Sequence, residues 1–286
     1  MEDVMGVIID SLMLSSIYIL VSLGFALVLS IINILNFAHG ALYMIGGYVC
    51  YCLAVLLGLN PWLSLVLAII VLGLVGLFLE RFSFRPFVDD ANRTVVMAVA
   101  IILILETTAN VFFGSENRVI PSFAPGVFQI GAIHIAFERL VTFITCGVLL
   151  IGLSLFVIKT RKGQQMLAVS QEREGAMLQG IRIHRISALA ISVSCALAAI
   201  AGSFMGAIFD LKPFMGGTML IKAIEVVVLS GIGSIGGILV GGLIIGTIDT
   251  VLPIFAGGAV TQAVGLGIII ALLLLKPQGL FGREVA

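Results

Sequence analysis

The sequence predicts an all-α membrane protein, a polytopic helical bundle of about eight full spans with a short or broken helix near residues 219–233. Composition is the first observation: 60% of the 286 residues are hydrophobic and 10% are charged, whereas about 25% are charged in soluble domains. The second is a series of apolar runs of membrane-crossing length. These runs use most of the chain, so we expect one transmembrane domain over residues 1–286.

The apolar runs are long enough, or nearly so, to cross a bilayer as helices of roughly 20 residues. They lie at about 7–30, 39–58, 61–79, 94–113, 140–158, 187–209, 235–252 and 259–275. A further run, Met219–Leu229, is too short to span and contains Lys222 and Glu225. We expect a broken helix that continues near Gly231, because non-helical backbone is tolerated at membrane depth where protein surrounds it.

Two connections leave alternatives open. Residues 30–39 contain Asn33, Asn36 and His39 but no Lys, Arg, Asp or Glu. They form either a cytoplasmic turn or a break buried in the membrane, and in the second case the amino terminus could lie on either side. The longest outer connection, about 114–139, contains Pro121 and Pro125 and predicts a small cap or a re-entrant element.

The loop at residues 159–186 sets the expected orientation. It carries six of the fifteen Lys and Arg residues, and such loops stay in the cytoplasm during insertion. Because successive spans cross the membrane in opposite directions, eleven of the fifteen cations then lie inside, in segments 80–93, 159–186 and 276–286. Arg118, Arg139, Lys212 and Lys222 fall outside. Within the loop we expect a short helix, Ala168–Leu178, which ends at Gly180 and is offered to a cytosolic partner.

Several functional classes are excluded by what the sequence lacks. The net charge is zero, so nucleic-acid binding is not expected. The sequence has no P-loop motif and no hydrolase or zinc-protease motif, so energy must come from a partner or an ion gradient, and we expect no catalytic residue, cofactor or metal. The string Gly231-Ile-Gly233-Ser-Ile-Gly236 resembles a dinucleotide motif but lies outside any βαβ pattern.

Glycines spaced by four residues begin within that string and continue beyond it. Small residues at this spacing let two membrane helices approach closely. We therefore assign helix packing, or a flexible break, to Gly233, Gly237 and Gly241.

Polar residues inside the apolar runs are the candidates for a transport path. Ser11, Ser15, Tyr18 and Ser22 fall within roughly 60° of arc on one helix face. This stripe either packs against another helix or lines a hydrated path. Glu106 lies deep in a span, where ionisable residues are costly and are usually functional. The candidate path residues are Ser15, Ser22, Asn36, His39 and Glu106. Asp249 supports the same argument more weakly.

Four stretches together resemble the LivH-type permeases of ABC importers for branched-chain amino acids. The first runs from Gly24 to Tyr48 and contains Asn-Phe-Ala-His-Gly at residues 36–40. The others are residues 168–181, the glycine-rich run 231–246, and the ending Leu-Lys-Pro-Gln-Gly-Leu-Phe-Gly at 275–282. The resemblance covers essentially the whole chain.

The resemblance implies a bacterial cytoplasmic (inner) membrane and several partners. These are a second permease, more readily a LivM-like heterodimer partner than a second copy of this chain, together with two cytoplasmic ABC ATPases and an external solute-binding protein. It also implies that the cytoplasmic loop docks on an ATPase through Ala168, Glu172, Arg173 and Gly180.

The implied substrate is a branched-chain amino acid. Urea, short amides and short carboxylates are alternatives within the family. From the residues alone, an ion-coupled secondary transporter and a membrane scaffold without transport also remain open.

Overall fold

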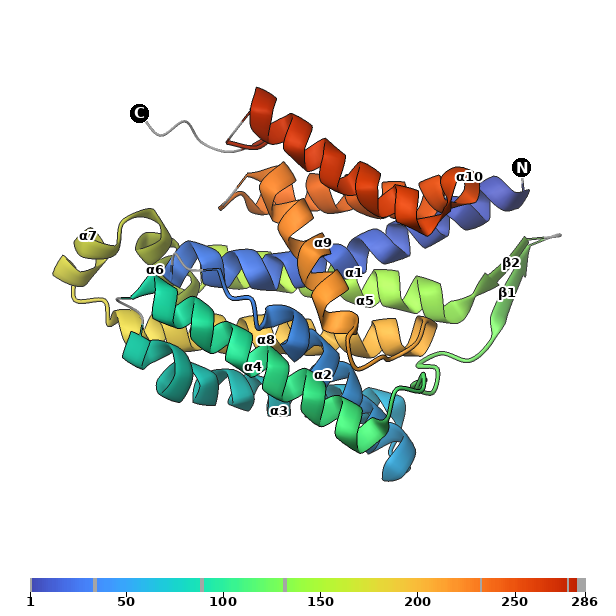
Figure 1. Cartoon of the computed structure of the whole chain (residues 1–286), viewed down its shortest axis with the longest axis horizontal. Coiled ribbons are helices and arrows are strands. Elements are labelled where there is room, and N and C mark those ends of the chain that lie inside the picture. The colour runs from blue at the N-terminus through green and yellow to red at the C-terminus, as the bar shows by residue number, and fades with distance from the viewer. Residues whose placement is uncertain are drawn as a thin grey trace.

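The computed structural model describes residues 2–32, 35–87, 90–130, 133–231, 233–276 and 278–281. Figure 1 shows long helices lying alongside one another, with one helix, α9 (Met215–Ser230), crossing them obliquely. Helices α6 (Arg161–Gln171) and α7 (Arg173–Leu178) and the end of α10 (Ile235–Leu275) lie at one end of the bundle, while the start of α1 (Glu2–Ile32) and a β-hairpin lie at the other. The expected all-α membrane bundle is confirmed, with the hairpin as a small addition. Asn33 lies outside the described residues.

The described elements follow one another in this order. They are α1 (Glu2–Ile32), α2 (His39–Tyr51) with a π-helical turn (Cys52–Leu56), α3 (Pro61–Leu79) with a π-helical turn (Glu80–Phe84) and a 3₁₀ turn (Arg85–Phe87), α4 (Ala91–Phe113), β1 (Val127–Ile130), β2 (Ile133–Ala136), α5 (Phe137–Lys159), α6 (Arg161–Gln171), α7 (Arg173–Leu178), α8 (Ile183–Ile208), α9 (Met215–Ser230) and α10 (Ile235–Leu275).

Within the described residues, seven helical segments are long and apolar enough to cross a membrane. A shorter apolar helix, Val260–Leu275, corresponds to the last expected span. It follows Gly257, whose φ of 69° interrupts α10 and separates it into two helices. Figure 1 shows the second of these running back toward the α6–α7 end. The two predicted runs at 235–252 and 259–275 are therefore two passes joined by a sharp reversal.

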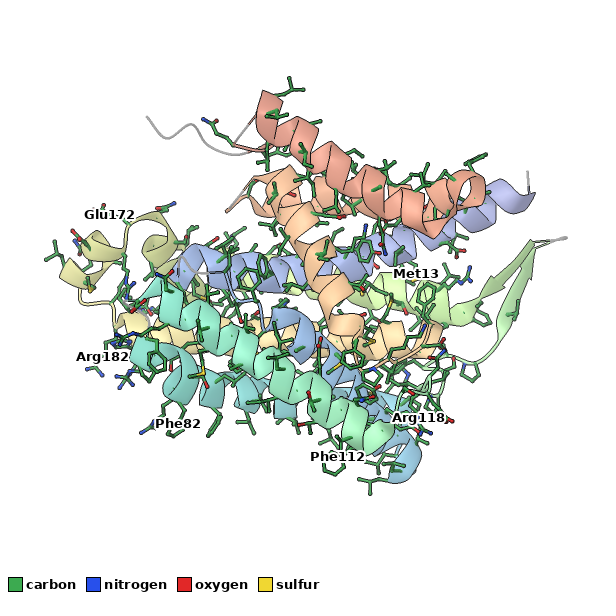
Figure 2. All side chains as sticks on the ribbon, viewed as in Figure 1. Met13, Phe82, Phe112, Arg118, Glu172 and Arg182 are labelled. Atoms are coloured by element: carbon green, nitrogen blue, oxygen red, sulfur yellow. The ribbon has the colours of Figure 1, made fainter. Side chains whose placement is uncertain are left out.

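Helices α1 and α8 form the centre of the bundle, and both are buried along most of their length. Glycines bring α2 against α8: a methyl group built on Gly46 would lie 2.8 Å from the Cβ atom of Ala199, and one built on Gly202 would collide with the Tyr43 carbonyl. Helices α3, α4 and α5 are peripheral. Figure 2 shows Phe82 and Phe112 directed away from the bundle, as expected of side chains that face lipid.

The start of α2 is buried inside the bundle. The Asn36 side chain accepts a hydrogen bond from the Ala38 amide (3.1 Å), which fixes the turn before the helix. His39 contacts the Val21 carbonyl, which lies 11 residues before the end of α1, or about 16 Å along the helix. Asn36 and His39 are both buried. This geometry favours the membrane-buried break over a cytoplasmic turn.

The loop at 159–186 differs from its prediction. The expected single helix Ala168–Leu178 is wrong, because Glu172 adopts an extended conformation (φ −153°, ψ 111°) that separates α6 from α7. Helix α6 buries Met166 and Val169, but the polar residues that follow supply no apolar face to continue it. The expected glycine cap is present. Gly180 has φ +78°, and the hydrogen bonds from Gly180 to Met177 and from Ile181 to Ala176 form a Schellman motif.

The outer connection forms a cap and not a re-entrant element. Strands β1 and β2 pair antiparallel, with Val127 opposite Ala136 and Ile130 opposite Ile133. Before the hairpin, Arg118 pairs with Leu211 through two backbone hydrogen bonds of 3.1 and 2.7 Å. These bonds fasten the cap to the segment that joins α8 and α9.

The described cations are concentrated at the α6–α7 end. Ten Lys and Arg residues lie in segments at that end, while Arg118, Arg139 and Lys212 lie at the hairpin end. Lys222, which was counted among the outer cations, is instead buried within the bundle. The distribution supports a cytoplasmic α6–α7 end. We therefore call this the cytoplasmic end and the hairpin end the outer end.

Candidate transport site

A charged cluster is buried where α1, α9 and α10 meet. The Nζ atom of Lys222 lies 3.0 Å from Oε2 of Glu225 and 2.9 Å from Oδ1 of Asp249. The other oxygen of Asp249 accepts a hydrogen bond of 2.8 Å from the hydroxyl of Tyr18. The Lys222 and Glu225 side chains are 6% and 2% exposed. We call these four residues the charge cluster.

The sequence contained part of the signal for this cluster. Lys222 and Glu225 are three residues apart, so they lie on the same face of α9 and can pair directly. Asp249 and Tyr18 come from distant parts of the chain, and no local pattern shows that they meet the same lysine. Because intramembrane charges pair or line functional cavities, the cluster is the leading site candidate.

Two cavities flank α9 and both reach Lys222. One, about 430 Å³, extends from Asp10 and Arg139 at the outer end to Asp249 and is bordered by the second half of α10; we call it the outer chamber. The other, about 550 Å³, lies under the loop that joins α8 to α9. Tyr18 and Phe209 line both cavities. An ion pair between Asp10 and Arg139 joins α1 to α5 at the chamber.

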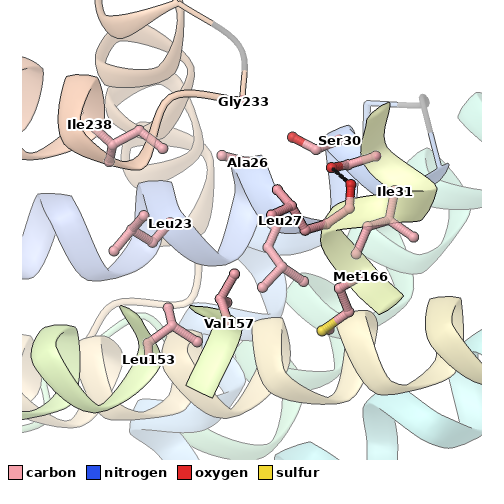
Figure 3. A pocket seen from close by; sticks show the side chains of 12 residues that line it. Leu23, Ala26, Leu27, Ser30, Ile31, Leu153, Val157, Met166, Gly233 and Ile238 are labelled. Atoms are coloured by element: carbon pink, nitrogen blue, oxygen red, sulfur yellow. Dashed lines mark hydrogen bonds between the residues drawn. The ribbon is translucent and has the colours of Figure 1, made fainter. Parts of the chain in front are cut away.

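A different kind of cavity lies toward the cytoplasmic end. It measures about 80 Å³ and is lined mainly by apolar side chains. Figure 3 shows Leu27 of α1, Val157 of α5 and Met166 of α6 directed into the same space. The open space next to the charge cluster is therefore wide on the outer side, whereas the apolar gap around Leu27, Val157 and Met166 is small.

The five predicted path residues do not form one site: Asn36 and His39 lie together at the start of α2, and none of the five lines either of the two large cavities. Ser15 packs against α10, where its hydroxyl lies 3.5 Å from the Leu243 carbonyl. The Ser22 hydroxyl is buried without a hydrogen-bond partner among the described residues. Of the stripe on α1, Tyr18 is the residue that reaches both cavities.

His39 has structural contacts on both ring nitrogens. Nε2 lies 3.0 Å from the Val21 carbonyl, and Nδ1 lies 3.2 Å from the hydroxyl of Ser194 on α8. Because a carbonyl only accepts hydrogen bonds, Nε2 carries the hydrogen and the neutral ring accepts at Nδ1. His39 thus ties α1, α2 and α8 together, while Asn36 forms the turn that precedes it.

Glu106 is half-buried on the peripheral helix α4. The described part of the chain gives it no hydrogen bond and no ion pair. Thr107 and Thr108 beside it are exposed. A carboxyl group at this depth is costly against lipid. Glu106 does not belong to the charge cluster, and its role in a transport path remains a prediction.

The glycines at the start of α10 have different functions. Methyl groups built on Gly237 and Gly241 would lie 2.7 Å from the Ser230 carbonyl and 3.0 Å from the Val226 carbonyl, so both positions allow α10 to touch α9. Gly233 has open space around it and a φ of +86°. Of the two alternatives, packing or a break, Gly233 therefore fits the break, because the turn before α10 requires its backbone conformation and not its small size.

Helix α9 is held closely at both ends. A methyl group on Gly216 would lie 2.6 Å from the carbonyl oxygen of Gly40 at the start of α2. At the other end, the amides of Leu280 and Phe281 donate to the Leu229 and Ser230 carbonyls at 2.9 and 3.0 Å. We call residues 279–281 the C-terminal clasp. These bonds satisfy carbonyls that a helix end otherwise leaves unpaired.

Comparison with known proteins identifies the family. Residues 7–275 match the family described as "Branched-chain amino acid transport system / permease component". The chain belongs to this family. The permease is 31% identical to the high-affinity branched-chain amino acid transport system permease protein BraD of Pseudomonas aeruginosa, over 96% of this chain and 95% of BraD. It is 30% identical to the LivH permease of Escherichia coli K12, over 94% and 92% of the two chains. The resemblance to LivH-type permeases is confirmed.

A solved structure shares the fold of the permease. A chain of PsaBC from Streptococcus pneumoniae in complex with Fab aligns with a TM-score of 0.51 over 94% of this permease and 91% of that chain. The sequence identity is 12%, so this likeness concerns the fold alone.

The cytoplasmic loop presents two short helices at the end of the bundle, and Figure 2 shows Glu172 there. Ala168 is half-buried on α6, Arg173 is half-buried at the start of α7, and Glu172 and Gly180 are exposed. At the end of α7, Leu178 is 88% exposed. An apolar side chain so exposed beyond the bundle suits a protein contact.

Proposed function

We propose that this permease forms the membrane path of an ABC importer that carries branched-chain amino acids into the cytoplasm. The bundle spans the bacterial cytoplasmic membrane several times, and partner subunits hydrolyse the ATP. The family match over residues 7–275 supports the transport class. The observation that carries the proposal is the charge cluster at the end of the outer chamber, where an arriving solute would meet it.

The cavities support an outward-facing arrangement. The outer chamber and the cavity beneath the α8–α9 loop measure about 430 and 550 Å³. Toward the cytoplasmic end the apolar gap around Leu27 and Val157 is about 80 Å³. In this arrangement a solute delivered by an external binding protein enters from the outer end, and apolar packing blocks its exit. Import then requires the bundle to change between two states.

We assign the coupling of ATP hydrolysis to α6 and α7. Ala168, Glu172, Arg173 and Gly180 remain the proposed coupling residues, and exposed Leu178 adds an apolar contact. The break at Glu172 lets α7 turn away from α6, so α7 can enter a cleft of an ATPase as a separate unit. Two ATPases imply two such loops, and we propose a LivM-like permease as the partner that supplies the second.

Reconstitution tests this function. Proteoliposomes are prepared with the permease, its partner permease, two ATPases and the solute-binding protein. The uptake of labelled leucine is then compared with the uptake of labelled urea. We expect leucine uptake that requires ATP and the binding protein. Uptake driven by an ion gradient without ATP would instead indicate a secondary transporter. An active complex whose only permease is this chain would overturn the heterodimer.

A further inference from the structure

The outer chamber has a charged end and an apolar wall. Asp249, Lys222 and Tyr18 lie together at one end, while Met13, Leu14 and Pro253 contribute apolar surface. Its volume of about 430 Å³ lies within the range of about 300–1,000 Å³ that is usual for small-molecule pockets. A ligand that complements this lining carries a charged group and an aliphatic part.

The charge cluster has unused hydrogen-bonding capacity at Lys222 and Asp249. It contains one lysine and two carboxylates, all largely buried. Lys222 donates to one oxygen of each carboxylate, and its third N–H makes no hydrogen bond to another described residue. Each Asp249 oxygen accepts one bond and has a second lone pair. Because a largely buried carboxylate is stabilised by a hydrogen-bonded cation, a cationic donor in the chamber would complete the bonding of Asp249.

The two carboxylates are placed differently. Asp249 lines the outer chamber, whereas Glu225 lines neither cavity and is almost fully buried. Glu225 therefore holds Lys222 in position from behind and does not meet a ligand. A methyl group on Gly265 would lie 3.1 Å from Glu225, which shows that the second half of α10 covers this side.

We infer that Asp249 binds the ammonium group of an α-amino acid in the outer chamber. The third N–H of Lys222 takes the ligand carboxylate, and the aliphatic side chain lies against the apolar wall formed by Met13, Leu14 and Pro253. This inference rests on the proposed function and names the recognition chemistry of the same site. It excludes urea, neutral amides and simple carboxylates as ligands of the chamber, because none of them supplies a cation.

A matched pair of variants tests the position of the charge. Asp249→Asn and Glu225→Gln each remove one negative charge, nearly preserve side-chain size and leave Lys222 one carboxylate partner. Leucine binding is measured by saturation-transfer NMR on the purified complex in nanodiscs. Because a hydrogen bond to a charged group is lost, we expect Asp249→Asn to weaken binding by about 10-fold or more and Glu225→Gln to weaken it much less. Equal losses in the two variants would overturn the inference.

A competition series on the unaltered complex provides a test that does not depend on variant folding. The competitors are 3-methylbutylamine, 4-methylpentanoate and 4-methylpentanamide, which keep the leucine side chain and differ in charge. We expect the amine to displace leucine and the acid and amide to fail. If the acid or the amide displaces leucine as strongly as the amine does, recognition of the ammonium group is refuted.

Uptake by the same complex separates this inference from the proposed function. ATP-dependent leucine uptake combined with equal losses in both variants would refute the role of Asp249 and leave the importer intact. Failure of the unaltered complex to take up leucine, valine or isoleucine would refute the proposed function itself.

Discussion

Replacing Gly246 by alanine tests how closely α10 lies against α1. A methyl group at this position would lie 2.6 Å from the Cα atom and 2.7 Å from the backbone nitrogen of Ser15. Packed carbon atoms in proteins lie about 3.5–4.0 Å apart, so the two helices would have to separate by about 1 Å. The obstacle is backbone, and a change of rotamer cannot relieve it.

The expected cost of Gly246→Ala follows from two opposing effects. Overpacking a close-packed contact costs about 1–3 kcal/mol, and a backbone obstacle places this site near the upper value. Alanine in place of glycine in a helix returns about 1 kcal/mol. We therefore expect a net loss of about 2 kcal/mol in the free energy of unfolding.

Unfolding in mixed detergent micelles, followed by circular dichroism, measures this difference. Gly267→Ala is the control, because Gly267 lies in the second helix of α10 and no atom of the described residues lies within 4 Å of an added methyl group. The control should be unchanged or more stable by up to about 1 kcal/mol. If Gly246→Ala is as stable as the control, α10 does not lie on α1 as described.

Further predictions concern the charge cluster, the cytoplasmic loop, α4 and the clasp. Lys222→Met leaves two buried carboxylates without their cation and should cost about 3–5 kcal/mol in the same micelle assay; unchanged stability would show that the pairs do not form. Gly180→Val places a β-branched residue at φ +78°, a strain of about 1–2 kcal/mol, so more ATP should be hydrolysed per solute imported, while Gln179→Ala should behave as wild type. Glu106→Leu should change the stability of the isolated chain by less than about 0.5 kcal/mol, because no described residue pairs with it; a large loss would reveal a partner within the chain. Gly279→Ala should speed hydrogen exchange of the clasp amides, since its methyl group would lie 2.6 Å from the Cα atom of Gly231, and unchanged exchange would argue against the clasp.

The membrane-spanning runs could be predicted because each depends on local composition. A run such as 61–79 carries its own signals, and Asn60 caps the resulting helix by accepting a hydrogen bond from the Trp62 amide. The broken helix near 219–233 was also predictable, because a short apolar run with two charges cannot cross a membrane alone. The cap at Gly180 follows from the preference of glycine for positive φ.

The candidate site depended on contacts that no local pattern contains. Ser15 and Tyr18 lie on the same stripe of α1, yet Ser15 packs against backbone while Tyr18 bonds Asp249 on α10. Their difference is set by how α10 crosses α1. Glu106 stands out in the sequence because it is an acid within a long apolar run. Lys222 lies in the short run 219–229 and is counted there among the outer cations, whereas α9 buries it within the bundle.

The two attachments of α9 give it the geometry of a lever. With Gly216 as the fulcrum against Gly40, Lys222 lies about 9 Å along the helix and Ser230, held by the C-terminal clasp, lies about 21 Å along it. A movement of about 3 Å at Ser230 would then shift Lys222 by about 1.3 Å. A shift directed away from Asp249 would lengthen the 2.9 Å contact between Lys222 and Asp249 to about 4 Å, beyond hydrogen-bond range. A small displacement at the cytoplasmic end of α9 is therefore sufficient to break the contact between Lys222 and Asp249 at the charged end of the outer chamber.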